Sequence, residues 1–86
     1  MEAELKSMLI AVADEFVRAT GRKPGGVWAS AVNDARFQDR IESGKTFTVA
    51  VFDNAMRWFS DNWPDGAFWP ASVPRPMSVK VGGAAA

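Results

Sequence analysis

Four of the five prolines lie after residue 63, and this placement limits where regular helix can form. A proline inside a helix removes one backbone hydrogen bond and clashes with the preceding turn. The helices must therefore be built from residues 1–62, which we take as the folded domain. The segment after it is rich in tryptophan as well as proline, so we expect residues 63–78 to form an ordered arm packed on the same domain. Residues 79–86 are expected to form a flexible tail.

The N-terminal segment, residues 2–20, has the periodicity of a helix with one buried face. Its large apolar residues recur every three or four positions, and Gly21 is a favourable C-terminal stop. The connector GRKPGG follows and contains two structure breakers in a row. Residues 27–32, VWASAV, are expected to form a short second helix anchored by Trp28. The periodic positions of the first helix are Leu5, Leu9, Val12 and Phe16.

A third helix is expected over residues 33–43. Asn33 is a favourable N-cap, and Asp34 suits the first turn because the free amide groups there prefer negative charge. Gly44 ends this helix, with Lys45 next to the negative end of the helix dipole. Two apolar residues four positions apart, Phe37 and Ile41, form its buried face.

Residues 46–62 fit two structures. Alternating apolar residues from Phe47 to Val51 are typical of a strand, whereas the later apolar spacing predicts a helix that Thr48 caps and Pro64 ends. A single strand would have no evident partner in this chain, so we favour the helix. The fold class expected is therefore all-α, a compact bundle of four to five helices with an ordered Trp/Pro-rich arm.

The residue inventory excludes most catalytic and metal chemistry. The chain of 86 residues contains no Cys, His or Tyr, so most nucleophile–base pairs and most zinc or iron sites cannot be built. We expect no enzymatic activity, no catalytic residue, no metal, no cofactor and no small-molecule ligand. No apolar run approaches the length of a membrane span, and the N-terminus carries acids where a secretory signal carries bases, so we expect a cytoplasmic protein.

The charges cancel overall but are unevenly distributed. Residues 2–15 carry four acids and one base, whereas residues 18–45 carry six bases and three acids. A locally basic region is what a polyanion partner needs, although a mixed solvated surface explains this small excess about as well. The six bases are Arg18, Arg22, Lys23, Arg36, Arg40 and Lys45.

The order of these elements, and above all the run RIESGKTFT at residues 40–48, resembles the lambda-repressor/Cro-like helix-turn-helix superfamily. Members commonly end the recognition helix with an Arg–aliphatic–Glu–x–Gly run, followed by a Ser/Thr-capped helix. The resemblance covers roughly residues 5–62, although Gly25 and Gly26 stand where members generally begin a continuous helix. The chain is also similar to a group of small uncharacterised bacterial proteins with an NDxxF turn and a WFSxNWP ending.

The resemblance implies that residues 33–43 form a DNA recognition helix. Arg36 then suits guanine and Gln38 adenine, since each can make the paired hydrogen bonds that those base edges offer, and Ala35 suits a thymine methyl group. Asp39 can accept from a cytosine amino group, but Asp39 and Glu42 also repel phosphates. The base-contact candidates are Ala35, Arg36, Gln38 and Asp39, and the phosphate-contact candidates are Arg22, Lys23, Arg40 and Lys45.

Two functions are compatible with these features. The resemblance implies a small helix-turn-helix transcriptional regulator of phage or plasmid type, which binds double-stranded DNA as a homodimer. Neutral charge and the acids at positions 39 and 42 favour the alternative, a protein-interaction module on the same fold that does not bind DNA. The arm either seals the bundle or presents an aromatic patch to a protein partner. The interface candidates are Trp63, Phe68 and Trp69.

Overall fold

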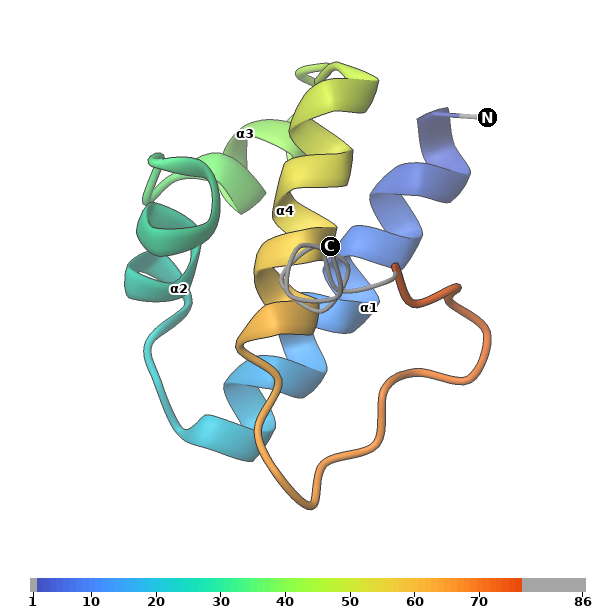
Figure 1. Cartoon of the computed structure of the whole chain (residues 1–86). Helices are drawn as coiled ribbons and strands as arrows, with labels where there is room; N and C mark the ends of the chain where they lie inside the picture. The colour runs from blue at the N-terminus through green and yellow to red at the C-terminus, as the bar shows by residue number, and fades with distance from the viewer. Residues whose placement is uncertain (1, 77–86) are drawn as a thin grey trace, which may run out of the picture.

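The computed structural model describes residues 2–76, in which four α-helices precede an extended segment (Figure 1). No strand occurs among these residues, so the expectation of an all-α fold is confirmed. The expected tail, residues 79–86, and the last two residues of the expected arm lie outside the described part of the chain. The helices are α1 (Glu2–Thr20), α2 (Pro24–Val32), α3 (Phe37–Glu42) and α4 (Val49–Asp61).

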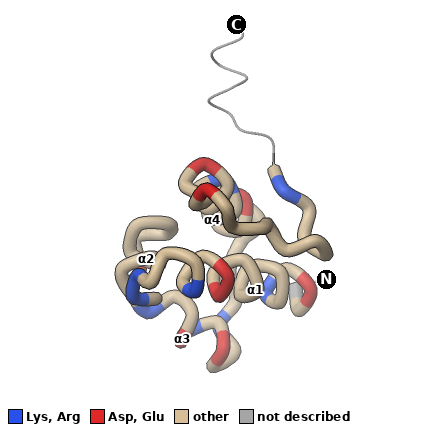
Figure 2. The backbone as a smooth tube through the Cα atoms, turned by 90° about the horizontal axis from the view of Figure 1, so that it is seen from below, with Lys and Arg blue, Asp and Glu red and all other residues tan. Residues whose placement is uncertain are grey.

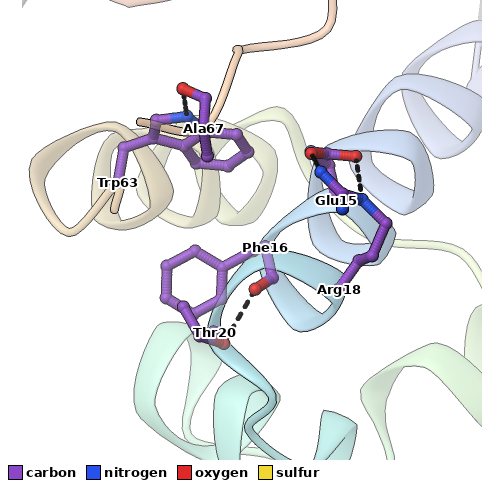
Figure 3. A network of polar contacts seen from close by, with 6 residues as sticks. All are labelled: Glu15, Phe16, Arg18, Thr20, Trp63 and Ala67. Atoms are coloured by element: carbon purple, nitrogen blue, oxygen red, sulfur yellow. Dashed lines mark hydrogen bonds and ion pairs between the residues drawn. The ribbon is translucent and has the colours of Figure 1, made fainter. Parts of the chain in front are cut away.

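The helix α1 forms as its periodicity predicts. Its buried face packs against α4 and α2, and the helix ends at Gly21, whose φ of 73° places it in the left-handed region. The Gly21 amide donates to the Val17 carbonyl at 2.8 Å, and the Thr20 hydroxyl donates to the Phe16 carbonyl at 2.8 Å (Figure 3). These two bonds satisfy carbonyls that a helix end otherwise leaves unpaired. The buried residues of α1 are Leu9, Val12, Ala13 and Phe16.

In the last turn of α1, the Arg18 guanidinium donates to both carboxylate oxygens of Glu15 (Figure 3). The hydrogen bond and the positive charge of Arg18 lower the pKa of Glu15 from its ordinary value. A lowered folded-state pKa stabilises the fold above the ordinary pKa of glutamate, and this contribution is lost as the pH falls through the folded-state pKa. The pair lies at the surface, so its contribution is small.

The helix α2 begins at Pro24, three residues before the expected start at Val27, so the interpretation of residues 24–26 as connector was wrong. Proline suits the first helical position because its missing N–H would be unpaired there and its φ is already helical. Gly25 lies next to the segment that follows α2, and a Cβ atom at this position would make an ordinary van der Waals contact, at 3.6 Å, with the Ala35 carbonyl oxygen. Val27 and Trp28 are the buried residues of α2.

The helix α3 begins at Phe37 and not at Asn33, so the expected eleven-residue helix 33–43 is reduced to six residues. Asn33 adopts the left-handed conformation (φ 60°, ψ 34°) and ends α2, its amide donating to the Ala29 carbonyl at 3.0 Å. Asp34 accepts from the Arg36 amide at 3.0 Å and so closes a turn in place of a helix. Burial of Phe37 and Ile41 is as expected.

The helix α4 confirms the helical interpretation of residues 49–61 and the cap at Thr48. The Thr48 hydroxyl accepts from the Val51 amide at 3.1 Å, with Thr48 itself in an extended conformation. This geometry excludes the strand alternative at Val49 and Val51. The buried residues of α4 are Ala55, Met56, Phe59 and Ser60.

Replacement of Thr48 by alanine is expected to lower the free energy of unfolding by about 1 kcal/mol, because it leaves one amide of the first turn without an acceptor. Equilibrium urea unfolding, followed by far-ultraviolet circular dichroism, measures this loss. Thr46→Ala, on the exposed loop before the cap, is the matched control and should change stability by less than about 0.5 kcal/mol. Equal effects of the two substitutions would contradict the capping role.

Aromatic rings dominate the core. Phe59 is fully buried in the middle, with ring centroids 5.4 Å from Phe16, 5.6 Å from Trp28 and 5.3 Å from Trp58. These contacts join α1, α2 and α4 at one point, mostly in the edge-to-face arrangement that aromatic rings prefer. Two further aromatic residues, Phe47 and Phe52, are half-buried and pack against this core.

The extended segment, residues 63–76, is here called the arm. Trp63 lies with its ring 6.0 Å from Phe16 and 4.8 Å from Trp69, and Val73 is buried. Each indole N–H is satisfied within the arm, by the Ala67 carbonyl at 2.9 Å (Figure 3) and by the Val73 carbonyl at 2.8 Å. The arm therefore packs on the helices as an ordered element.

Arg75 attaches the end of the arm to the last turn of α4. Its Nε donates to the Ser60 hydroxyl and its Nη2 to the Ser60 carbonyl, both at 2.9 Å, while the guanidinium lies 5.1 Å from the centre of the Trp69 ring. The Ser60 carbonyl belongs to the last helical turn, where carbonyls lack helical partners and a cation is favoured. Figure 2 shows the arm and α4 on the opposite side of α1 from α3.

Candidate nucleic-acid interface

The candidate interface is built from α2, α3 and the four residues between them. Asn33, Asp34, Ala35 and Arg36 link the two helices, and this length is typical of a helix-turn-helix unit. The rings of Trp28 and Phe37 lie 5.0 Å apart and hold α3 against α2. The unit is therefore part of the core on one side and exposed on the other.

The base-contact candidates lie close together, but only two of them are on α3. Ala35 and Arg36 belong to the turn, and both are exposed. Asp39 is exposed on α3 and lies between two shallow hollows. One, of about 440 Å³, is also lined by Pro24, Gly25 and Ala35, and the other, of about 450 Å³, by Arg36, Arg40 and Ser43.

Gln38, the fourth base-contact candidate, makes two hydrogen bonds within the protein. Its amide oxygen accepts from the indole Nε1 of Trp28 at 3.0 Å, and its amide nitrogen donates to the Glu42 carboxylate at 3.2 Å. Gln38 is half-buried, whereas Glu42 is exposed. Its amide thus faces α2 and the next turn of α3.

Of the four phosphate-contact candidates, the two arginines interact with other side chains of the protein and the two lysines are exposed. Arg40 donates from Nε to Asp34 at 3.1 Å, and Arg22 lies 5.9 Å from the ring centres of both Phe16 and Trp58. Lys23 is the exposed N-cap of α2, and Lys45 is exposed after α3. Within the described residues, Lys23, Arg36 and Lys45 have no ion-pair partner.

Sequence reasoning missed Lys6, which the structure places beside Lys45. The Lys6 Nζ donates to the Ile41 carbonyl at 3.4 Å, near the C-terminus of α3, and both lysines line a hollow of about 200 Å³. Lys6 lies on the acidic first helix and is separated from Ile41 by 35 residues, so no local pattern points to this contact. Lys6 is half-buried, so it adds a partly covered lysine beside the C-terminal end of α3.

Basic and acidic positions are interspersed along the backbone in the view of Figure 2. On α3 itself, Asp39 and Glu42 are exposed together with Arg40. Within residues 2–76, no group of three or more acidic side chains is arranged to hold a metal ion. No helix in the same part of the chain combines the length and apolar content that a membrane crossing requires.

The protein-interface candidates differ in exposure. Trp63 and Trp69 are half-buried against the core, whereas Phe68, between two residues of the arm that face inward, is 88% exposed. Gly66, with φ at 84°, gives the chain the left-handed turn that precedes Phe68. Phe68 therefore lies at the surface of the arm, and Figure 2 shows the arm on the opposite side of α1 from α3.

Comparisons with protein-family models, with curated proteins and with solved structures found no match to this chain.

Proposed function

We propose that the chain is a small DNA-binding regulator of the helix-turn-helix type, and that α2, the four-residue turn and α3 form its contact with duplex DNA. The observation that carries this proposal is the turn itself. It leaves Ala35 and Arg36 exposed beside Asp39, at the end of a short helix whose other side is fixed in the core. A short helix projecting from a folded domain fits the width of the major groove.

Within this proposal, Arg36 reads guanine through its two parallel donors, and Ala35 is small enough to approach a thymine methyl group. Asp39 accepts from a cytosine amino group, which also gives its negative charge a partner in the groove. Lys23 and Lys45 bind phosphates on either side, and the first turn of α2 adds the partial positive charge of its free amides beside Lys23. Arg22 and Arg40 contribute less, because both are engaged within the protein.

The decisive experiment is selection of bound sequences from random duplexes, followed by affinity measurements at several salt concentrations. The two lysines assigned to phosphates, Lys23 and Lys45, predict a slope of log K against log salt of about −2 for each chain bound. Enrichment of a defined sequence bound in the nanomolar range supports the proposal. Failure to enrich any sequence, with affinity for all duplexes weaker than about 10⁻⁴ M at physiological salt, contradicts it.

The substitution Arg36→Ala is expected to reduce discrimination between the selected duplex and random duplexes by about 1–3 kcal/mol, since it removes a base contact. Lys23→Ala is expected to weaken binding to all duplexes equally and to make the salt slope shallower by about one unit. Arg57→Ala is the matched control, because Arg57 is exposed on α4 and lines a hollow together with residues of the arm. A similar loss of duplex affinity in all three variants would indicate general charge attraction without a specific interface.

The second candidate function is a protein-interaction module that does not bind DNA. The observation that favours it is the charge on α3, where Asp39 and Glu42 are exposed and the nearby Arg40 is paired with Asp34. The double change Asp39→Asn with Glu42→Gln separates the two functions. A DNA-binding protein gains affinity for non-specific duplexes, because repulsion of phosphates is removed, whereas an interaction module loses its partner in a pull-down.

A further inference from the structure

Three side chains form a continuous hydrogen-bonded chain from α2 to α3, which we call the Trp28–Gln38–Glu42 relay. Trp28 is the largest side chain of the core and is 1% exposed. Its indole Nε1 donates to Gln38 at 3.0 Å, and Gln38 donates in turn to Glu42 at 3.2 Å. The relay begins in the core and ends at the surface of α3.

The chemistry of the indole fixes the orientation of the Gln38 amide. An indole nitrogen can only donate, so the atom of Gln38 that faces it must be the amide oxygen. The amide nitrogen then points to Glu42, which as a carboxylate can only accept. Adenine recognition needs the oxygen and the nitrogen of one amide to face a base edge together, and this relay directs them elsewhere.

We infer that Gln38 is a positioning residue, which sets the orientation of α3 relative to α2 and thereby the direction of the exposed side chains beside it. A buried indole N–H without an acceptor is costly, so Trp28 holds Gln38 in one place. Gln38 belongs to α3, and its bond to Trp28 therefore restricts rotation of this short helix about its own axis. Glu42 restricts the remaining freedom of the amide. For its DNA readout, this inference rests on the proposed function.

The first test measures the indole proton of Trp28 by ¹⁵N-edited NMR, with Trp28→Phe to assign its signal. Gln38→Met keeps the length of the side chain and removes the acceptor. We expect exchange of the Trp28 indole proton with solvent to become about tenfold faster, the size of one lost hydrogen bond. The indole protons of Trp63 and Trp69 are the internal controls, because backbone carbonyls hold them. An unchanged Trp28 signal in Gln38→Met overturns the inference.

The second test restores the relay with its partners exchanged. In the double change Gln38→Glu with Glu42→Gln, the carboxylate at position 38 accepts from Trp28 and also from the new amide at position 42. The net charge of α3 stays the same. We expect this variant to recover most of the slow exchange that Gln38→Met loses. Failure of the exchanged pair to recover it, with the variant folded, contradicts the role of the relay.

Duplex binding distinguishes positioning from base reading. If Gln38 positions α3, Gln38→Met lowers affinity for the selected duplex about tenfold without changing the preferred base at any position, and the exchanged pair recovers this affinity. If Gln38 reads adenine, Gln38→Met relaxes preference at one base pair, the exchanged pair does not restore it, and the inference fails. Should no duplex be selected, the proposed function falls, while the indole exchange rates still decide whether the relay holds α3.

Discussion

A chain truncated after Asn62 is expected to lose about 5 kcal/mol of unfolding free energy, since the truncation removes two half-buried tryptophans and the buried Val73. It also removes Arg75, which satisfies a carbonyl at the end of α4. A domain of 86 residues has a total stability of roughly 4–13 kcal/mol, so the truncated chain should be marginal or unfolded. Urea unfolding monitored by circular dichroism gives the measurement.

Phe68→Ala in the full chain is the control for this truncation. It removes an aromatic ring from the same arm, but from a side chain that is 88% exposed, and should change stability by less than about 0.5 kcal/mol. If the truncated and full chains unfold at the same urea concentration, the arm does not stabilise the domain. An intermolecular role for Trp63 and Trp69 would then be favoured.

The sequence predicts α1, α4 and the arm well because their signals are local and agree with one another. The first helix has a long apolar period and a glycine stop, and Thr48 offers a hydroxyl at the right distance before the apolar face of α4. The prolines after residue 63 exclude helix there, and the tryptophans between them favour burial. Each of these elements is therefore specified by residues within its own segment.

The starts of α2 and α3 depend on contacts that a local pattern does not contain. Pro24 and the two following glycines look like a break, but proline also suits the first turn of a helix. Asn33 is favoured both as an N-cap and in the left-handed conformation that ends a helix. In the structure Asn33 takes the second role: it ends α2 in the left-handed conformation, and α3 packs against Trp28.

The residues of the candidate site that one local segment supplies could be predicted from the sequence. Ala35, Arg36 and Asp39 come from the predicted recognition segment and lie close together at the surface. The partners of the remaining polar residues could not be deduced, because they lie elsewhere in the sequence. Gln38 meets Trp28, ten positions earlier, and Lys6 meets Ile41, 35 positions later.

The charge pairing near α3 bears on the strength of any DNA complex. Arg40 is paired with Asp34, so its guanidinium is less available to phosphates than its exposure alone suggests. Glu42 accepts a hydrogen bond from Gln38, so its carboxylate is less available to bases. Under the proposed function, phosphates would be contacted mainly through Lys23 and Lys45, and affinity should depend on sequence recognition more than on bulk charge.

Phe59→Ala is expected to lower the free energy of unfolding by about 3–5 kcal/mol, the typical cost of removing a fully buried aromatic ring. The loss should reach the upper end of this range because Phe59 contacts rings from α1, α2 and α4 at once. Phe52→Ala makes the same chemical change at a half-buried position of the same helix and should cost roughly half as much. Urea unfolding of the two variants gives the comparison.

The outcome of Phe59→Ala also determines how the candidate interface can be tested. A loss near 4 kcal/mol equals the whole stability at the lower end of the roughly 4–13 kcal/mol range, so a failure of this variant to bind DNA would carry no information about the interface unless the variant is shown to be folded. Phe59→Leu keeps most of the buried volume and should retain a folded domain at a smaller cost. A cost below about 1 kcal/mol for Phe59→Ala would show that α1, α2 and α4 are not joined at this ring. The orientation of α3, which depends on Trp28 in the same cluster, would then need a different explanation.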